Sequence, residues 1–555
     1  MRLSTSHLSS QRLPTPSRIF DTANYKDSLA KSNLISSLKG SKPSKRVVVI
    51  GGGLSGLACA KYLVDSGHKP IVLEARRVLG GKVSAWQSPD GSWVETGLHI
   101  FFGAYPNMMN LFSELGLHDR LQWKPHRMTF AMPKKPGTFT SFEFPPNVPA
   151  PFNMAAAILS NNEMLGLVEK IQMVPGLLPM LLEGQDFIDA QDELSVDEFM
   201  SKYGMPESVK EEIFIAMGKA LDFMDPDKLS MSVILTAMNR FINEADGSQT
   251  AFLDGNQPDR LCAPMREYIE ERGGEVRTGV PVREILTGEG GRVEGLSTDG
   301  GMVEGDYYVS AMPVDVMKKL LPKTWSEMPF FTQINELEGV PVINIQIWFD
   351  RKLPALDGLC FSRSPLLSVY ADMSVCCEEY YDEDKSMLEL VFAPATKAAG
   401  AERNWISESD EDILEATLKE LENVFPEDVK DEGGAKVEKY TVVRTPRSVY
   451  ATTPGRNKFR PSQKTPISNF VLAGDWSSQK FLGSMEGAVL AGKLAAEVVA
   501  SGVVDEEGGW KEGGIGKEGG RGMEGGVGDP MGLKGNHPIA FGGGQEVLGQ
   551  ECYHP

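Results

Sequence analysis

The sequence predicts an α/β fold in which a buried parallel sheet alternates with helices. Between Arg46 and Glu74, two apolar runs suited to buried strands flank a helical segment. A glycine turn at 51–56 (GGGLSG) joins the first strand to that helix. The same alternation of strand and helix returns at 261–311 and again at 469–488. A Rossmann-like domain assembled from separated segments of the chain explains these observations.

The glycine turn has the spacing of a dinucleotide-binding fingerprint. Gly51 permits the tight turn, Gly53 lets the backbone approach a pyrophosphate at the helix N-terminus, and Gly56 lets helix and strand pack closely. Glu74 ends the second strand, where its carboxylate can accept hydrogen bonds from ribose hydroxyls. This pattern leaves NAD and FAD both open. The cofactor contacts expected from this stretch are Gly51, Gly53, Ser55, Gly56, Glu74 and Ala75.

Composition limits the other classes of function. With 555 residues, of which 41% are hydrophobic, the chain is long enough for two or three domains. The net charge of −20 argues against nucleic acid as a partner. The six cysteines show no CxxC pairing, so we expect no metal site and no disulfide framework. No window reaches the roughly 18 uninterrupted apolar residues of a membrane span, and any membrane contact is therefore expected from one face.

A second glycine segment follows the ribose acid and separates FAD from NAD. Arg76 and Arg77 precede Gly80-Gly81-Lys82. This segment resembles the Arg-x-x-x-Gly-Gly stretch of flavin-dependent amine oxidases and carotenoid desaturases. Glycines let the loop pass close over a diphosphate, and basic groups can face it. The resemblance favours FAD and adds Lys82 to the expected cofactor contacts.

Three further stretches narrow the resemblance. Residues 95–107 (ETGLHIFFGAYPN), 252–256 (FLDGN) and 371–374 (ADMS) resemble the plant-type phytoene desaturases almost residue for residue. The likeness extends from about residue 47 to about 499. It implies a Rossmann-like (GR2-type) FAD domain, an inserted mixed-sheet substrate domain and a helical, membrane-facing subdomain. It also implies 15-cis-phytoene as substrate, plastoquinone as electron acceptor and a plastid (chloroplast) location, and it leaves open whether the chain forms a homo-oligomer.

The same resemblance implies further site residues. The turn and aromatic run from Gly97 to Tyr105 can lie along an isoalloxazine ring, although core packing explains Phe101 and Phe102 equally well. We treat His99 as a cofactor contact rather than an acid–base group, and no catalytic side chain is expected. By resemblance, FAD contacts His99, Ile100, Tyr105, Asp475 and Met485, and Ala488 lies near the substrate.

Arg240 lies inside an apolar helical segment at 196–241. By resemblance it meets the polar headgroup of a quinone or an inhibitor in the substrate channel. The alternative is a structural salt bridge, because a buried arginine needs a partner.

The stretch at 145–182 is unusually apolar but is interrupted by polar residues. It suits a patch that enters one leaflet of a membrane. The alternative is that these helices cover the substrate cavity and touch no lipid. We favour peripheral (monotopic) membrane contact, because a long hydrocarbon substrate must arrive from lipid.

The two ends of the chain differ in composition from its centre. Residues 1–20 are rich in Ser, Thr and Arg, and no apolar h-region follows, so residues 1–44 fit a transit peptide rather than a folded segment. A disordered tail is the alternative. After residue 501 the composition of Gly, Glu and Lys predicts a disordered tail. The expected organisation is a transit peptide (1–44), FAD-binding segments (45–144, 251–315, 463–500), a helical subdomain (145–250), a substrate-binding domain (316–462) and the tail (501–555).

The expected reaction removes a hydride and a proton from neighbouring carbons, and two rounds on phytoene would give ζ-carotene, via phytofluene. The first rival is a ζ-carotene desaturase, which shares the fold and cofactor. An amine oxidase is a more distant rival. A rival from another class is a non-catalytic, flavin-bearing carotenoid-binding protein.

Overall fold

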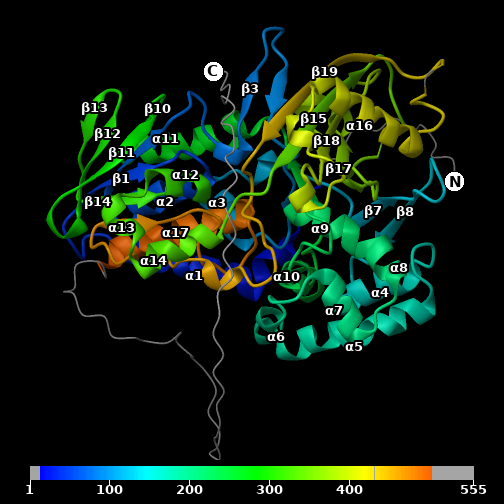
Figure 1. Cartoon of the computed structure of the whole chain (residues 1–555), viewed down its shortest axis with the longest axis horizontal. Helices are drawn as coiled ribbons and strands as arrows, with labels where there is room; N and C mark the ends of the chain where they lie inside the picture. Colours follow the sequence, from blue (N-terminus) through cyan, green and yellow to red (C-terminus); the bar gives the residue numbers. More distant parts are fainter. Residues whose placement is uncertain (1–12, 355, 431, 503–555) are drawn as a thin grey trace, which may run out of the picture. The chain divides into compact units, whose positions relative to one another are not determined.

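A five-stranded parallel sheet carries the glycine turn predicted from the sequence (Figure 1). The computed structural model describes residues 13–354, 356–430 and 432–502. Val47 and Val49 face one core and Val48 and Ile50 face another, so both sides of the first strand are buried. The strands lie in the order β10-β2-β1-β14-β20, with bounds β1 Arg46–Ile50, β2 Lys69–Glu74, β10 Glu275–Thr278, β14 Tyr307–Ser310 and β20 Phe470–Leu472.

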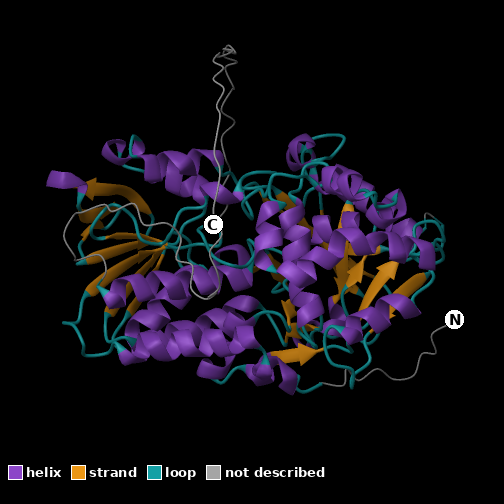
Figure 2. Ribbon diagram, turned by 90° about the horizontal axis from the view of Figure 1, so that it is seen from below, coloured by secondary structure: helices purple, strands orange, loops and turns teal. Residues whose placement is uncertain are grey.

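Helices cover this sheet (Figure 2). Helix α2, which follows the glycine turn, and helix α17 near the end of the described chain approach very closely, because a Cβ on Gly492 of α17 would lie 2.2 Å from the carbonyl oxygen of Ser55 of α2. The predicted Rossmann-like domain, assembled from segments far apart in the chain, is confirmed. Its helices and small strands are α2 Leu54–Asp65, α3 Pro106–Leu115, α11 Ala263–Glu271, α17 Met485–Ser501, β3 Ala85–Gln87, β4 Trp93–Glu95, β5 Phe101–Phe102, β6 Leu121–Trp123, β9 Thr250–Leu253, β11 Val282–Thr287, β12 Val293–Thr298 and β13 Gly301–Val303.

The second large sheet is mixed, as predicted, and has seven strands. Among the strand pairs that the structure describes in this sheet, β16 and β7 are parallel and the others are antiparallel. Helix α16 (Asp410–Val424) covers one face through the side chains of Ile343, Ile345 and Ile347. The opposite face joins the core of the helical region. The order is β19-β15-β18-β17-β16-β7-β8, with bounds β7 Arg127–Ala131, β8 Phe139–Glu143, β15 Val342–Phe349, β16 Cys360–Phe361, β17 Leu367–Asp372, β18 Met387–Phe392 and β19 Val437–Thr445; the short helix α15 Met373–Cys376 follows β17.

Two predicted domain boundaries need correction. Strands β7 and β8 belong to the second sheet, although they precede the boundary expected at residue 144. Helices α12 (Val314–Leu320), α13 (Lys323–Ser326) and α14 (Pro329–Thr332) lie on the Rossmann-like side, beyond the boundary expected at residue 315. The ring of Trp325 lies 4.8 Å from that of Phe470 on β20. Packing between distant segments therefore decides both boundaries.

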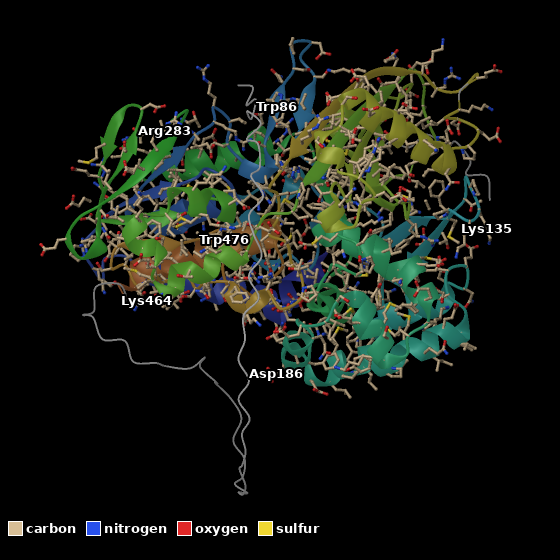
Figure 3. The ribbon with its side chains drawn as sticks, viewed as in Figure 1. Trp86, Lys135, Asp186, Arg283, Lys464 and Trp476 are labelled. Carbon is tan, nitrogen blue, oxygen red and sulfur yellow. The ribbon has the colours of Figure 1, made fainter. Side chains whose placement is uncertain are left out.

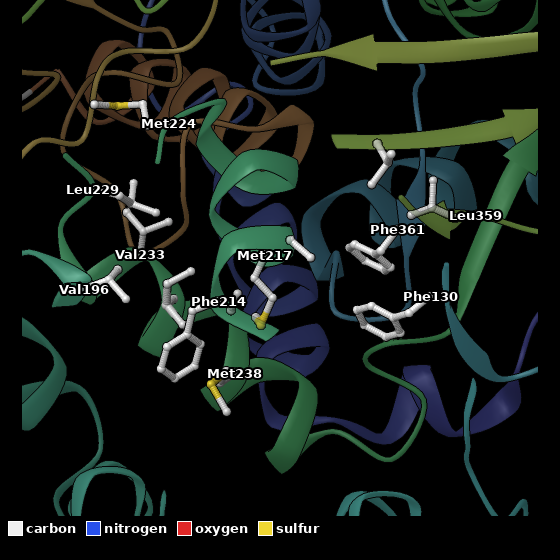
Figure 4. Close-up of a cluster of buried hydrophobic side chains, with 14 of the residues drawn as sticks. Phe130, Val196, Phe214, Met217, Met224, Leu229, Val233, Met238, Leu359 and Phe361 are labelled. Carbon is white, nitrogen blue, oxygen red and sulfur yellow. The ribbon is translucent and has the colours of Figure 1, made fainter. Parts of the chain in front are cut away.

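A helical region follows β8, and its apolar spacing at 196–241 predicted it correctly. Methionine and phenylalanine side chains fill its core, and Figure 4 shows Phe214, Met217 and Met238 gathered there. Phe130 and Phe361 of the second sheet stack beside them at 4.7 Å between ring centroids (Figure 4). The helices are α4 Phe152–Ser160, α5 Leu167–Glu183, α6 Gln185–Ala190, α7 Val196–Tyr203, α8 Glu207–Val209, α9 Ile215–Asp222 and α10 Met231–Asn243.

The boundary expected at residue 44 between a targeting segment and the fold needs correction. Helix α1 (Ala23–Ser37) packs on the Rossmann-like domain and buries Tyr25, Ser28 and Ser32. Lys493 donates a 2.8 Å hydrogen bond to Ser28 from α17. The folded chain thus begins well before residue 45. Residues 1–12 and the tail from residue 503 lie outside the described residues.

Candidate functional site

The glycine turn forms a cradle without side chains. Gly51 has a φ of +107°, which favours glycine, and a Cβ on Gly56 would lie 1.9 Å from the carbonyl oxygen of Gly51. Gly53 is the N-cap of α2 and provides no side-chain cap, so the first amides of that helix are free to bind an anion. Gly81 lies across from it, and a Cβ on Gly81 would lie 3.0 Å from the Cα of Gly53. The two predicted glycine segments therefore line one space.

The expected ribose acid is held by backbone groups. Glu74 accepts hydrogen bonds from the amides of Gly52 (2.8 Å) and Arg76 (2.9 Å). These bonds hold the carboxylate beside the glycine turn, where a ribose would lie. Ala75 follows at the end of β2 and is exposed.

Three distant cofactor segments meet at Lys82 and Asp475. The ammonium of Lys82 lies 2.8 Å from the carboxylate of Asp475, so this lysine is paired. The hydroxyl of Ser55 accepts a 2.8 Å hydrogen bond from the amide of Gly474. The indole of Trp476, labelled in Figure 3, donates to the carbonyl oxygen of Met312 at 2.9 Å and fixes the loop after β20. These contacts join the glycine turn, the second glycine segment at 80–82 and the segment that follows β20.

Two side chains in the segment from Thr96 to His99 form hydrogen bonds with the backbone of Lys82. The Thr96 hydroxyl donates to the carbonyl oxygen of Lys82 at 2.7 Å, and Nε2 of His99 donates to the same oxygen at 3.1 Å. Burial lowers the pKa of His99 to about 4, so the ring is neutral near pH 7. A carbonyl can only accept, which places the proton on Nε2. This neutral, hydrogen-bonded histidine suits the expected role as a contact rather than an acid–base group.

The aromatic run after His99 divides between two cores. Ile100 joins the core of the helical region, whereas Phe101 is fully buried in the Rossmann-like domain, edge-on to Phe112. Phe102 is half-buried, with its ring centroid 5.5 Å from that of Tyr105 and 5.4 Å from that of Phe241 on α10. Phe101 is thus a packing residue, and Phe102 faces the helical region.

Arg240 lies near the end of α10 without an ion pair among the described residues. Its Nη2 donates to Gln185 at 3.4 Å, its guanidinium lies 5.3 Å from the ring centroid of Phe481, and its Nε is buried without a hydrogen-bond partner. Burial lowers the pKa of this guanidinium. The salt-bridge alternative therefore does not describe the structure, and a donor remains for a ligand.

The start of α17 brings Met485 and Ala488 to the edge of the Rossmann-like core, where both are half-buried. Between them lies Glu486, which the sequence interpretation missed. Its carboxylate is fully buried and accepts from the amide (3.0 Å) and side chain (2.6 Å) of Asn107 and the amide of Met108 (2.9 Å). Burial raises the pKa of Glu486 to about 7. Its signal in the sequence was an acidic residue in the first turn of a largely apolar helix.

Comparison with known proteins identifies the family. The flavin containing amine oxidoreductase family matches residues 54–500. The 15-cis-phytoene desaturase (chloroplastic/chromoplastic) of Capsicum annuum is 56% identical over 483 residues, which cover 86% of this chain and 82% of that protein. This chain belongs to the phytoene desaturase family. The 15-cis-phytoene desaturase of Synechococcus elongatus is 55% identical over 82% of this chain and 95% of its own length.

More distant relatives agree with this membership. The zeta-carotene desaturase of Synechocystis is 34% identical over 82% of this chain and 97% of that protein. The solved structure of a putative protoporphyrinogen oxidase from Exiguobacterium has a TM-score of 0.60 at 20% identity, over 83% of this chain and 99% of that one, and shows the fold alone. The chain is therefore an FAD-dependent oxidoreductase with the flavin amine oxidase fold.

The residues present fit FAD. The glycine cradle leaves room for a diphosphate at the amides of α2, and Glu74 lies where a ribose would bind. Among the described residues, no group of three or more His, Cys, Asp or Glu side chains could hold a metal ion. No helix in the described ranges is both long enough and apolar enough to cross a membrane.

Proposed function

We propose that this protein desaturates 15-cis-phytoene to ζ-carotene, through phytofluene, in a plastid, and that a plastoquinone re-oxidises the cofactor. The observation that carries this proposal is the 55–56% identity to 15-cis-phytoene desaturases over most of the chain, against 34% to a zeta-carotene desaturase. The plant relatives' names include chloroplastic/chromoplastic, which supports the plastid. FAD, when bound, supplies the hydride acceptor.

The chain's own residues position the reaction and exclude water. The amides of α2 and the carboxylate of Glu74 bind the adenosine diphosphate half, and the Lys82–Asp475 pair closes the cradle on the other side. The neutral ring of His99 holds the loop that would lie along the flavin. The apolar core around Ile100 suits a hydrocarbon substrate and keeps water away from the reacting carbons.

Helices α4 and α5 present an apolar face that supports monotopic membrane contact. Nine of the large apolar side chains described on these helices are between 40% and 76% exposed, whereas Met173, Gly176 and Met180 on the other side of α5 are buried. A contiguous exposed apolar patch of this kind marks a binding surface. We call it the α4–α5 apolar face; it consists of Phe152, Leu159, Leu167, Val168, Ile171, Val174, Leu178, Leu181 and Leu182.

Arg240 contacts the chain just after the C-terminal end of the α4–α5 apolar face. Helix α5 ends at Glu183, and Gln185, at the start of α6, accepts the hydrogen bond from Arg240. Both the carotene and a quinone come from lipid, so a channel that opens at this face would pass Arg240 first. The unpartnered Nε of Arg240 can donate to a quinone carbonyl, which is the role we propose for it.

The test is desaturation in liposomes. Purified, FAD-loaded protein is incubated with 15-cis-phytoene, with and without a plastoquinone analogue, and the absorption spectrum is followed. We expect ζ-carotene bands that appear only with the quinone. If the protein consumes supplied ζ-carotene and leaves phytoene unchanged, it is a ζ-carotene desaturase instead. No change with either carotene, despite a bound flavin, would favour the carotenoid-binding or amine-oxidase alternatives.

A further inference from the structure

A buried group of polar side chains lies where the predicted cofactor segment meets the second sheet. Glu95 ends β4, two residues before Gly97. Its amide donates to the side chain of Gln346 at 3.2 Å, and its carbonyl oxygen accepts from the side chain of Asn344 at 3.2 Å. Both partners lie on β15, so Glu95 is bonded to the sheet that the proposed substrate would contact.

These polar side chains lie on an otherwise apolar face. Because strand residues alternate, Asn344 and Gln346 point to the same side of β15 as Val342, away from α16. Glu389, on the neighbouring strand β18, accepts a 2.9 Å hydrogen bond from Asn344. Glu95, Asn344, Gln346 and Glu389 are all at most 4% exposed. A hydrocarbon substrate gives no reason for four buried polar side chains here.

The hydrogen bonds of this group are incomplete. The hydroxyl of Tyr380 donates to Oε1 of Glu95 at 2.5 Å, whereas Oε2 of Glu95 is buried without a hydrogen-bond partner. Oδ1 of Asn344 and Nε2 of Gln346 are likewise buried and have no hydrogen-bond partner among the described residues. A buried polar atom without a partner is costly, so its presence calls for a functional reason or an additional ligand such as water.

No positive charge balances the two carboxyl groups, since no ion pair with Glu95 or Glu389 occurs in the described part of the chain. Burial raises the pKa of Glu95 to about 8, although the hydrogen bond from Tyr380 acts to lower it. Burial and the charge of Glu95 raise the pKa of Glu389 well above its usual range. Burial therefore favours the protonated form of both carboxyl groups, and of the two only Glu95 has its charged form stabilised by the hydroxyl of Tyr380.

The other titratable groups around Glu95 are acidic or neutral. The carboxylate of Glu379 raises the pKa of Glu95 further. The thiols of Cys262 and Cys377 also face it, and burial raises the pKa of Cys262 to about 12 and that of Cys377 above its usual range, so both remain neutral. Glu95 is thus the group of this set that can take up or release a proton between pH 7 and 9.

We propose that Glu95 accepts the proton that leaves the substrate beside the hydride, with Tyr380 positioning its carboxylate. This assignment rests on the proposed function. One C–H bond breaks with its electron pair leaving as hydride to the cofactor, and the neighbouring C–H bond leaves its electron pair behind to form the C=C bond. The proton from that second bond goes to the Glu95 carboxylate. Reduction of the quinone takes two electrons and two protons in all, one of them from Glu95.

The first test measures the protonation of the Glu95 carboxyl group directly and needs no substrate. Infrared difference spectra of the FAD-loaded protein between pH 6 and 10 should show a protonated carboxyl band that is lost with a midpoint near 8. Glu95→Gln should abolish this titration, and Tyr380→Phe should move it to higher pH, because the anion loses its donor. Glu267→Gln, on the exposed surface of α11, should leave it unchanged. Burial raises the pKa of Glu486 and of Asp222 to about 7, so their carboxyl bands should titrate unchanged in every variant. A component with a midpoint near 8 that persists in Glu95→Gln overturns the proposal.

The second test uses single-turnover desaturation of phytoene in liposomes as a function of pH. The rate should rise through the same midpoint in the parent, fall about 10²-fold in Glu95→Gln, as for loss of a general base, and shift its midpoint upward in Tyr380→Phe. Circular dichroism and flavin content check that each variant is folded. If the parent itself makes no ζ-carotene, the proposed function fails, whereas an active parent with the same pH profile in all variants overturns the role of Glu95 alone.

Discussion

The exposure of the side chains on the α4–α5 apolar face allows a quantitative prediction of membrane binding. Val168, Ile171 and Leu182 are 69%, 60% and 76% exposed. Complete burial of such a side chain is worth about 1.5–3 kcal/mol, so the exposed part of each can contribute about 1–2 kcal/mol on entering lipid. Replacing all three with glutamine should therefore weaken membrane partitioning by about 4 kcal/mol, or about 10³-fold.

Flotation with phosphatidylcholine–phosphatidylglycerol vesicles measures this partitioning directly. The parent should rise with the vesicles, and the triple variant should remain in the aqueous fraction at the same lipid concentration. Its stability should change little, because the substituted side chains are exposed and glutamine is a good helix former. In detergent solution the triple variant should therefore keep its bound flavin and its activity on solubilised phytoene.

Two exposed apolar side chains elsewhere provide the matched control. Met302 lies on β13 and is 54% exposed, and Val316 lies on α12 and is 40% exposed. The double variant Met302→Gln, Val316→Gln should float like the parent. Equal flotation of the triple variant and the parent would refute membrane contact through α4 and α5, and an equal loss in the control would show that general surface hydrophobicity governs binding.

Three further predictions concern the cofactor cradle and the N-terminal helix. Gly56→Ala should purify without FAD, measured as flavin absorbance per protein, because its Cβ would meet a backbone oxygen at 1.9 Å. Ser28→Ala should lower the free energy of unfolding by about 2–4 kcal/mol, because it removes the 2.8 Å hydrogen bond that Lys493 donates to the Ser28 hydroxyl. The control Ser37→Ala, at an exposed position of the same helix, should change the free energy of unfolding by less than about 0.5 kcal/mol. The pKa of His99 is lowered to about 4, so the unfolded chain binds a proton between pH 6.5 and 4 that the folded chain does not. Stability should fall by about 3 kcal/mol over that range, and less in His99→Asn, as followed by denaturant titration.

The parts of the fold that local pattern determines could be predicted from the sequence. The glycine turn, the acid at the end of β2 and the buried strands of the first sheet each follow from residues close together in the chain. Resemblance to a family added the later segments, and the structure brings Lys82 and Asp475 within 2.8 Å, although 392 residues lie between them. Neither spacing nor composition alone could have paired them.

Contacts between distant segments could not be predicted. Helix α1 has little amphipathic character, and two of its buried residues are serines, so its composition looked like that of a targeting segment. Its docking depends on Lys493 and Asn107, which donate to or accept from Ser28. The placement of β7 in the second sheet depends on its pairing with β16, more than 200 residues later. Amino-acid composition gives no information about such hydrogen bonds or strand pairings between distant segments.

The segment from Glu95 to Phe102 contacts three parts of the molecule. Glu95 bonds to the second sheet, His99 bonds to the cofactor loop at Lys82, Ile100 packs in the helical core and Phe101 packs in the Rossmann-like core. A substitution that shifts this stretch changes the alignment of all three parts at once. Glu95, His99, Ile100 and Phe101 thus lie within eight positions of one continuous segment, so the geometry of that segment sets their positions relative to one another.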